Sequence, residues 1–224
     1  MRKTIDYILV YLFCCATVSA QQTNKTVQSL INNGYVNIQD ICPSIHVDLM
    51  YTRADNFTGQ VLYTDLQEAF LHPKAAKALA TAQEILKKQR PNLSIKVYDA
   101  ARPMHVQQRM WNVVKGTSKQ NYVSNPKNGG GLHNYGMAVD VTLCDEKGDT
   151  LDMGTPIDYL GKWAHIDIEE EMVEKGIISQ EAYHNRQLLR CVMKQAGFKP
   201  LRTEWWHFNF ITRAEAKAHY KVIP

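Results

Sequence analysis

Hydrophobic and polar positions alternate in several short segments of the chain, a pattern that predicts β-strands. Residues 45–51 alternate apolar and polar side chains, as a half-buried strand does. Residues 137–143 have the strongest β pattern and place Asp140 on the face opposite its two valine neighbours. Strands are also predicted at residues 93–100 and at the aromatic, β-branched residues 205–211.

Three segments are predicted to be helical, at residues 75–88, 103–115 and 180–196. The first is rich in Ala, Leu and Lys, has Pro73 at a first helical position and ends before Pro91. The second follows a break at Arg102, because the residue before a proline is pushed out of helical geometry. Ser179 suits the N-cap of the third helix, and Gly197 suits its end.

The order of these elements indicates the fold class. Strands and helices do not alternate strictly, so we expect an α+β fold with a mostly antiparallel sheet and helices packed on one side. Residues 21–224 contain no repeat, low-complexity tract or long linker and are predicted to form a single domain. Residues 21–40 are polar and are predicted to be a mobile or loosely packed lead-in.

The first twenty residues are typical of a secretory signal peptide. Arg2 and Lys3 precede a mostly apolar stretch at residues 7–17, and small residues at 18–20 suit a cleavage site. This apolar stretch is too short to span a membrane, and no other stretch approaches the ~20 residues required. We therefore expect an exported protein, periplasmic or secreted, whose mature chain has no transmembrane segment.

A lipoprotein signal is the alternative interpretation of the same residues, with lipid on Cys14 or Cys15. Phe13 and Cys14 occupy positions where small residues would be expected, which argues against lipid anchoring. Cleavage after residue 20 leaves three cysteines in the mature chain, Cys42, Cys144 and Cys191. An odd number permits at most one internal disulfide together with a free thiol.

The net charge of the chain is small. The formal value of +4 falls to +3 on cleavage, because two cations and one anion leave with the signal peptide. The remaining charges are scattered along the chain, so nothing in the sequence indicates a nucleic-acid partner.

Three residues supply a candidate set of metal ligands. His133 and Asp140 lie in one segment, and His207 lies in Glu204-Trp-Trp-His207 near the C-terminus. Three N/O ligands leave the fourth tetrahedral position of a zinc ion open for water, which distinguishes a catalytic zinc site from a structural one. The carboxylate of Glu204 is the kind of group that accepts a proton from that water.

The spacing of these residues constrains how they can meet. His133 and Asp140 would face opposite ways in one continuous strand, but Gly136 allows the chain to turn between them. The alternative is a surface histidine and an aspartate that caps a turn, although a carboxylate within an apolar strand is rarely unpaired. Glu204 and His207 converge only if the chain enters its strand at Glu204 or bulges there.

Other polar and aromatic residues have two interpretations each. Arg102 ends a strand, where it could stabilise a developing oxyanion, but an isolated arginine is more often a salt-bridged surface residue. Trp205 and Trp206 could enclose the site, and core packing is expected for at least one of them. Six histidines lack partners at ligand spacing and are predicted to be ordinary core or surface residues: His46, His72, His105, His165, His184 and His219.

These motifs resemble those of the zinc D-Ala-D-Ala dipeptidases, over residues 45–207. HxxxxxxD and EWWH alone would indicate the wider group of zinc D,D-peptidases. Further matches narrow the resemblance to the dipeptidase branch: Tyr51, residues 55–59, residues 98–103 and residues 153–158.

The resemblance implies a role for each candidate residue. One zinc ion per chain would be bound by His133, Asp140 and His207. Glu204 would act as general base and acid, and Arg102 would stabilise the transition state.

Tyr51 and Asp158 would recognise the free ammonium of the substrate, since both can accept hydrogen bonds from it. Two departures from the family pattern concern specificity. Gly131 stands where the family usually has serine, and residues 99–101 differ from the expected run before the arginine.

The leading hypothesis is therefore an exported zinc dipeptidase that hydrolyses D-alanyl-D-alanine. A zinc D,D-carboxypeptidase or endopeptidase acting on murein peptides is the alternative. Asp158 distinguishes these enzymes from a dipeptidase, because a long peptide offers no ammonium near the scissile bond. A non-catalytic zinc-bound binding module would need the metal ligands but neither Glu204 nor Arg102.

Overall fold

The computed structural model describes residues 24–224, and the predicted signal peptide with Cys14 and Cys15 lies outside them. The strands are β1 Val36–Asn37, β2 His46–Val47, β3 Phe70–Leu71, β4 Ser94–Asp99, β5 Ala138–Cys144, β6 Lys199–Leu201 and β7 Glu204–Asn209. The α-helices are α1 Lys25–Asn32, α2 Ile38–Ile41, α3 Pro73–Gln89, α4 Met104–Val114, α5 Glu169–Glu174, α6 Gln180–Gln195 and α7 Arg213–His219. Short 3₁₀ helices are η1 Met50–Thr52, η2 Gln120–Tyr122, η3 Pro126–Asn128, η4 Leu132–Tyr135 and η5 Lys162–Ala164.

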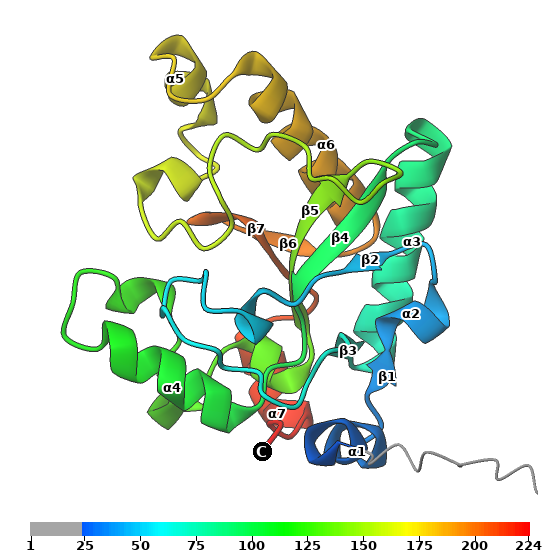
Figure 1. The fold of residues 1–224 in the computed structure, drawn as a ribbon, viewed down its shortest axis with the longest axis vertical. Helices are drawn as coiled ribbons and strands as arrows, with labels where there is room; N and C mark the ends of the chain where they lie inside the picture. Colours follow the sequence, from blue (N-terminus) through cyan, green and yellow to red (C-terminus); the bar gives the residue numbers. More distant parts are fainter. Residues whose placement is uncertain (1–23) are drawn as a thin grey trace, which may run out of the picture.

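A five-stranded sheet forms the centre of the domain, in the order β2-β4-β5-β7-β6 (Figure 1). β2 pairs with β4 in parallel, and the other three pairings are antiparallel. A separate antiparallel pair joins β1 to β3. The predicted α+β fold with a mostly antiparallel sheet is confirmed.

Helices α3 and α6 contact each other and pack against the central strands (Figure 1). The side chains of β5 alternate, so Val139, Val141 and Leu143 project to the face opposite Asp140, and all three are fully buried. Along β5 the face opposite Asp140 is therefore apolar, whereas the other face carries Asp140 and Thr142, and the residues on both faces are buried.

The long helices begin and end close to the predicted positions. Pro73 is the first residue of α3, and α3 ends before Pro91. The Ser179 hydroxyl accepts a hydrogen bond from the Ala182 amide at the start of α6, which satisfies one of the free N–H groups of the first turn. Gly197 follows the end of α6 with a φ of 93°, a left-handed conformation that glycine adopts without strain.

Two expectations from the sequence are wrong. The strand predicted at residues 45–51 is limited to β2, because the chain turns into η1 at Met50 and so buries Tyr51 in the core. Residues 24–40 are not a loose lead-in, since α1 buries Leu30 completely. Thr26 also donates a hydrogen bond to Asp65, which ties α1 to a distant loop.

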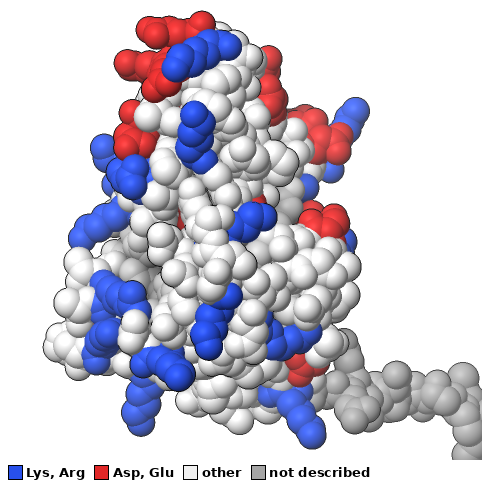
Figure 2. Space-filling model, turned by 90° about the vertical axis from the view of Figure 1, so that its left-hand side faces the viewer, with Lys and Arg blue, Asp and Glu red and all other residues white. Residues whose placement is uncertain are grey.

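None of the helices within residues 24–224 has the length and apolar character that a membrane crossing requires. In the same part of the chain, Cys42, Cys144 and Cys191 are free thiols. On the face drawn in Figure 2, lysine and arginine side chains are scattered, while acidic side chains gather at the end where α5 lies.

Candidate metal centre and active site

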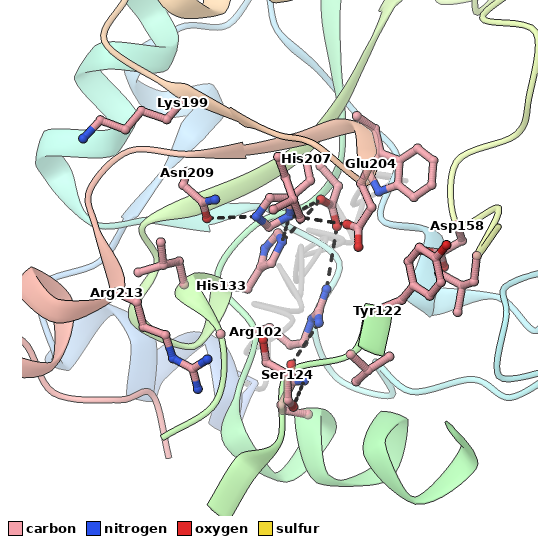
Figure 3. A pocket seen from close by; sticks show the side chains of 18 of the residues that line it. Arg102, Tyr122, Ser124, His133, Asp158, Lys199, Glu204, His207, Asn209 and Arg213 are labelled. Atoms are coloured by element: carbon pink, nitrogen blue, oxygen red, sulfur yellow. Dashed lines mark hydrogen bonds and ion pairs between the residues drawn. The ribbon is translucent and has the colours of Figure 1, made fainter. Parts of the chain in front are cut away.

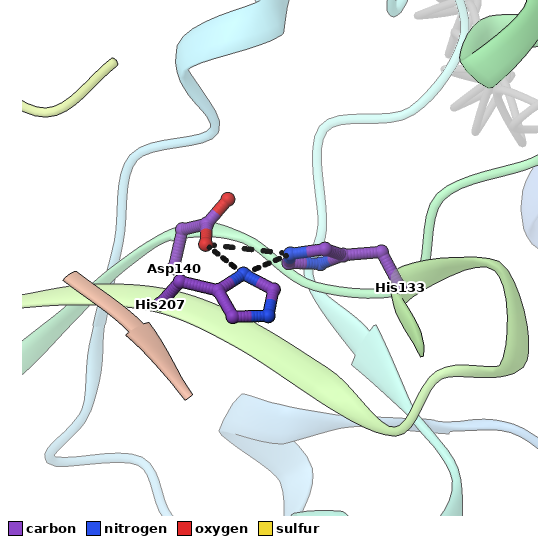
Figure 4. A group of neighbouring side chains, drawn as sticks. All are labelled: His133, Asp140 and His207. Carbon is purple, nitrogen blue, oxygen red and sulfur yellow. Dashed lines mark hydrogen bonds and ion pairs between the residues drawn. The ribbon is translucent and has the colours of Figure 1, made fainter. Parts of the chain in front are cut away.

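His133, Asp140 and His207 meet in one buried cluster (Figure 4). The Nε2 atom of His133 lies 3.2 Å from Nδ1 of His207, and this Nδ1 lies 3.0 Å from Oδ1 of Asp140. The third side of the triangle, from His133 Nε2 to Asp140 Oδ1, measures 3.3 Å. Side chains that are far apart in the sequence therefore present three ligand atoms to one point.

The local backbone explains why the cluster forms. His133 lies in η4, and Gly136 ends this turn with a φ of 63°, so the chain reverses before it enters β5. Asp140 of β5 is then paired in register with His207 of β7. The predicted turn at Gly136 is confirmed.

The outer nitrogen of each histidine is held by an oxygen acceptor. Nδ1 of His133 is 2.8 Å from the Ala100 carbonyl, which can only accept, so Nδ1 carries the proton. Nε2 of His207 is 2.9 Å from Oδ1 of Asn209 and donates to it in the same way. Both unprotonated nitrogens therefore face Asp140, the arrangement of metal-bound histidines with oriented rings.

The donor set fits a zinc ion. Three acceptor atoms at 3.0–3.3 Å repel one another unless a cation or a proton lies between them. Tetrahedral ligands about 2.0–2.1 Å from zinc lie about 3.3 Å from each other, close to the separations observed.

Glu204 lies beside the triad of His133, Asp140 and His207 without belonging to it. It is the first residue of β7, and its Oε2 is 3.9 Å from Nδ1 of His207. The chain enters the strand at this residue, one of the two arrangements by which the sequence allowed Glu204 and His207 to converge. Burial, with a smaller effect from Asp140 and Asp158, raises the pKa of Glu204 to about 8.

Arg102 is a buried member of the site and not a surface residue. Its Nε donates to Oδ2 of Asp99 at 2.8 Å, and its Nη1 donates to Oε1 of Gln107 at 2.9 Å. Its Nη2 lies 3.7 Å from Oδ2 of Asp140. The guanidinium is thereby fixed next to the metal ligands.

Asp99 is a residue of the candidate site that was not predicted from the sequence. Alternation along β4 would place it on the core face with Ile95 and Val97, but the register shifts after Val97 and Asp99 pairs with Asp140. The bulge turns its carboxylate toward Arg102, and Tyr63 donates a hydrogen bond to its other oxygen at 2.5 Å. The available signal was an aspartate within an apolar strand, three residues before the arginine.

Tyr51 and Asp158 lie together, as the resemblance implied. The hydroxyl of Tyr51 is 3.1 Å from Oδ1 and 3.0 Å from Oδ2 of Asp158. Burial and the nearby charge of Asp140 raise the pKa of Asp158 to about 7. No lysine, arginine or histidine within residues 24–224 forms an ion pair with Asp158.

One cavity of about 390 Å³ is lined by the three candidate metal ligands together with Tyr51, Arg102, Asp158 and Glu204, whereas Asp99 does not line it. Figure 3 shows His133 and His207 near the centre of this cavity, Glu204 and Asp158 toward one side, and Arg213 on the other. Trp206 lines this cavity and Trp205 is packed behind it, so both tryptophans are buried and one encloses the site.

Gly131, which stands where the family usually has serine, lies against the side chain of Ser124. A Cβ atom at this position would lie 2.9 Å from the Ser124 hydroxyl oxygen, so Ser124 takes the space of a side chain at 131. Ser124 lines the cavity and was not identified from the sequence. The six histidines without ligand partners remain outside the cluster, and His72 instead accepts a hydrogen bond at the N-terminus of α3.

The chain is similar to known peptidases over most of its length. The peptidase M15 family, described as D-ala-D-ala dipeptidase, matches residues 31–223. A D-alanyl-D-alanine dipeptidase of Escherichia coli is 34% identical over 174 residues, which cover 78% of this chain and 83% of the relative. A D-alanyl-D-alanine dipeptidase of Enterococcus faecalis is 26% identical over 200 residues, 81% of this chain and 93% of the relative.

Proposed function

The chain belongs to the M15 peptidase family of D-Ala-D-Ala dipeptidases, and we propose that it is an exported zinc metallopeptidase that hydrolyses D-alanyl-D-alanine. The His133, Asp140 and His207 triad would hold one zinc ion per chain. The site of cleavage would lie in the cavity between this triad, Glu204 and Arg102.

The observation that carries this proposal is the pair of Tyr51 and Asp158 at one end of the cavity. A carboxylate largely shielded from water without a cation is costly, and a ligand ammonium would remove that cost. Both side chains accept hydrogen bonds from such a group. A pocket that ends in this way suits a substrate whose free amino end lies one residue from the scissile bond.

The residues around the triad have separate roles in the proposed reaction. A bound zinc ion would supply Lewis acidity toward the scissile carbonyl and toward water. Glu204 accepts a proton from the attacking water at its carboxylate and delivers it to the leaving amine as the C–N bond breaks. Arg102, held rigid by Asp99 and Gln107, faces the negative charge that develops on the carbonyl oxygen. The products are two molecules of D-alanine.

The test compares three substrates with the purified, zinc-loaded protein: D-Ala-D-Ala, its N-acetylated form and a wall pentapeptide. We expect the free dipeptide to be preferred several-hundred-fold or more in kcat/KM. Removal of one partner of a buried pair costs about 3–5 kcal/mol, and each ~1.4 kcal/mol is a tenfold change in rate. Comparable values for the free and acetylated dipeptides would favour the D,D-carboxypeptidase instead.

Export is supported by the N-terminal sequence pattern alone. If residues 1–20 are a signal peptide, protein recovered from outside the cytoplasm should begin at Gln21. Intact-mass measurement of that protein decides between cleavage, a lipid-modified cysteine and an unprocessed chain.

A further inference from the structure

The loop that carries Asp158 holds this residue in an unusual backbone conformation. Asp158 has a φ of 64°, and no other residue except glycine has a positive φ within residues 24–224. Residues with a Cβ adopt this region only where the surrounding structure holds them there. The hydrogen bonds of Tyr51 hold the Asp158 side chain, so the backbone requires a second anchor.

One side of this loop borders a second cavity. Residues 150–157 all line a second cavity of about 640 Å³, which shares no lining residue with the cavity of the triad. A loop gains few contacts on the side that faces a cavity. Polar contacts therefore add to the packing of Met153, which is buried, and of Gly154, which lies close to Ile178 and Ala182.

Arg186 of α6 provides such contacts on both sides of Asp158. Its Nε donates to the Met153 carbonyl at 2.7 Å, and its Nη2 donates to the Thr155 hydroxyl at 3.1 Å. The same Nη2 lies 3.2 Å from the Trp163 carbonyl, which follows Asp158 in the chain. One planar guanidinium thus joins the two arms of the loop, a geometry that lysine cannot reproduce.

The contact through Thr155 also reaches the catalytic strand. The Thr155 hydroxyl accepts a hydrogen bond at 2.9 Å from the indole N–H of Trp205, the residue directly after Glu204. The Arg186 guanidinium lies 5.4 Å from the centre of the Trp205 ring. Loop, helix and β7 therefore share one buried junction.

The charge of Arg186 is only partly compensated by carboxylates. Its side chain is fully buried, its nearest carboxylate oxygen belongs to Glu169 at 3.6 Å, and its Nη1 has no hydrogen-bond partner among residues 24–224. Burial lowers its pKa to about 10. Glu169 itself receives hydrogen bonds from both terminal nitrogens of Arg190. Arg186 therefore directs most of its donors to the loop and not to its counter-ion.

We propose that Arg186 is a positioning residue that clamps residues 153–163, fixes Asp158 opposite Tyr51 and so sets the selectivity for a free amino end. The positional part depends only on the contacts described. The selectivity part rests on the proposed function, because it assumes that Asp158 binds the ammonium of the substrate.

Two variants weaken the clamp, and one variant serves as a matched control. Arg186→Lys keeps the charge but removes the fork, and Thr155→Val removes the shared hydroxyl. Arg190→Gln is the control. Arg190 also lies on α6 and contacts Glu169, but its hydrogen bonds go to Glu169 and not to the loop. If Thr155→Val does not fold, because it leaves two buried donors unpaired, Arg186→Lys carries the test alone.

The first measurement is amide hydrogen exchange, which requires no activity. We expect exchange over residues 153–163 to accelerate at least tenfold in the two clamp variants, relative to wild type and to Arg190→Gln. Equal exchange in Arg186→Lys and Arg190→Gln overturns the clamp.

The second measurement is selectivity between D-Ala-D-Ala and propionyl-D-alanine, in which hydrogen replaces the amino group without added bulk. We expect the ratio of kcat/KM values to fall at least tenfold in the clamp variants, mainly through KM, with zinc content unchanged. An unchanged ratio despite faster exchange overturns the selectivity role of Arg186. If wild type itself does not prefer the free amine, the proposed role of Asp158 is wrong, and exchange still decides whether the clamp exists.

Discussion

At the scale of single residues, Asp158 carries a cost in stability that depends on pH. Asp158 is largely shielded from water, has no ion-pair partner within residues 24–224, and has its pKa raised to about 7 from the ordinary value of 3.8. An acid whose pKa is raised by folding stabilises the folded state fully below its unfolded pKa. That contribution is lost as pH rises through the folded pKa. The window for Asp158 therefore runs from about pH 4 to pH 7.

We predict that Asp158→Asn is more stable than wild type at pH 8, and that the difference shrinks toward zero near pH 4. The shift alone corresponds to about 4 kcal/mol at ~1.4 kcal/mol per pKa unit, and partial access to solvent should reduce this to about 2 kcal/mol. Urea unfolding of the metal-free proteins at both pH values measures the difference in the free energy of unfolding between Asp158→Asn and wild type. Asp149→Asn, at an exposed residue of the same connection, serves as the control. A stability difference that does not depend on pH would contradict the assigned cause.

The separation of Glu204 from the metal ligands leads to a second prediction at this scale. Glu204 Oε2 is 3.9 Å from the nearest ligand atom of His207 and lies outside the triangle of ligand atoms. Glu204→Gln should therefore retain zinc after dialysis and lose roughly 10²–10⁴-fold in kcat, the usual contribution of a general base. Metal analysis beside a rate assay checks both parts. Asp140→Asn, which changes a ligand, should instead weaken zinc binding, and the same loss in Glu204→Gln would make Glu204 a ligand.

At the scale of elements, one turn and one strand pairing bring the candidate metal ligands together. The turn is η4 followed by Gly136, where the chain adopts a left-handed conformation in close contact with neighbouring residues. A Cβ at Gly136 would lie 2.6 Å from a ring carbon of Tyr35 and 3.0 Å from the backbone nitrogen of His72. The position of His133 therefore depends on the absence of a side chain three residues later.

We predict that Gly136→Ala destabilises the fold by about 2–4 kcal/mol and weakens zinc binding, because it combines backbone strain with overpacking. Gly176→Ala is a close control, since Gly176 has a φ of 64° and a Cβ added there would meet no atom within 4 Å among residues 24–224. It should cost only about 1–2 kcal/mol and leave zinc affinity unchanged. Denaturant unfolding and zinc titration compare the two variants. Equal zinc affinity in both would show that the turn does not position His133.

The elements also indicate what the sequence can and cannot predict. Helices α3 and α6 are set by local signals, such as Pro73 and the Ser179 cap, and their bounds were predicted closely. The bulge that turns Asp99 toward Arg102 depends on pairing with β5, a contact that no local pattern encodes. Helix α1 was missed for the same reason, because its Leu30 becomes buried only against distant parts of the chain.

The same distinction applies to the active-site residues. The candidate metal ligands and Glu204, which the structure brings close together, were selected from their residue types and spacing. The burial of Tyr51 in η1 and the contacts of Arg186 depend on tertiary packing, which a single sequence does not display. Ser124 could be connected with Gly131 only once the backbone brought the two segments together.

At the scale of the whole molecule, the candidate metal ligands come from parts of the chain that are distant in sequence. His133 comes from η4, Asp140 from the middle of the sheet, and His207 from the neighbouring strand β7. In the unfolded chain these residues are too far apart to form the same site. A bound ion should therefore stabilise the whole fold, because a ligand that binds only the native state raises the free energy of unfolding.

We predict that zinc at about 100 times its dissociation constant raises the free energy of unfolding by about 3 kcal/mol, or the melting temperature by about 5–10 °C in a domain of this size. A chelator should reverse the shift. His207→Ala removes one of three protein ligands and should abolish the zinc-dependent shift, whereas His184→Ala, at an exposed histidine outside the cluster, should preserve it. Thermal unfolding with zinc and with chelator, on wild type and both variants, separates a site-specific effect from adventitious binding. A full zinc-dependent shift in His207→Ala would require a different ligand set, and with it a different assignment of the residues that meet the substrate.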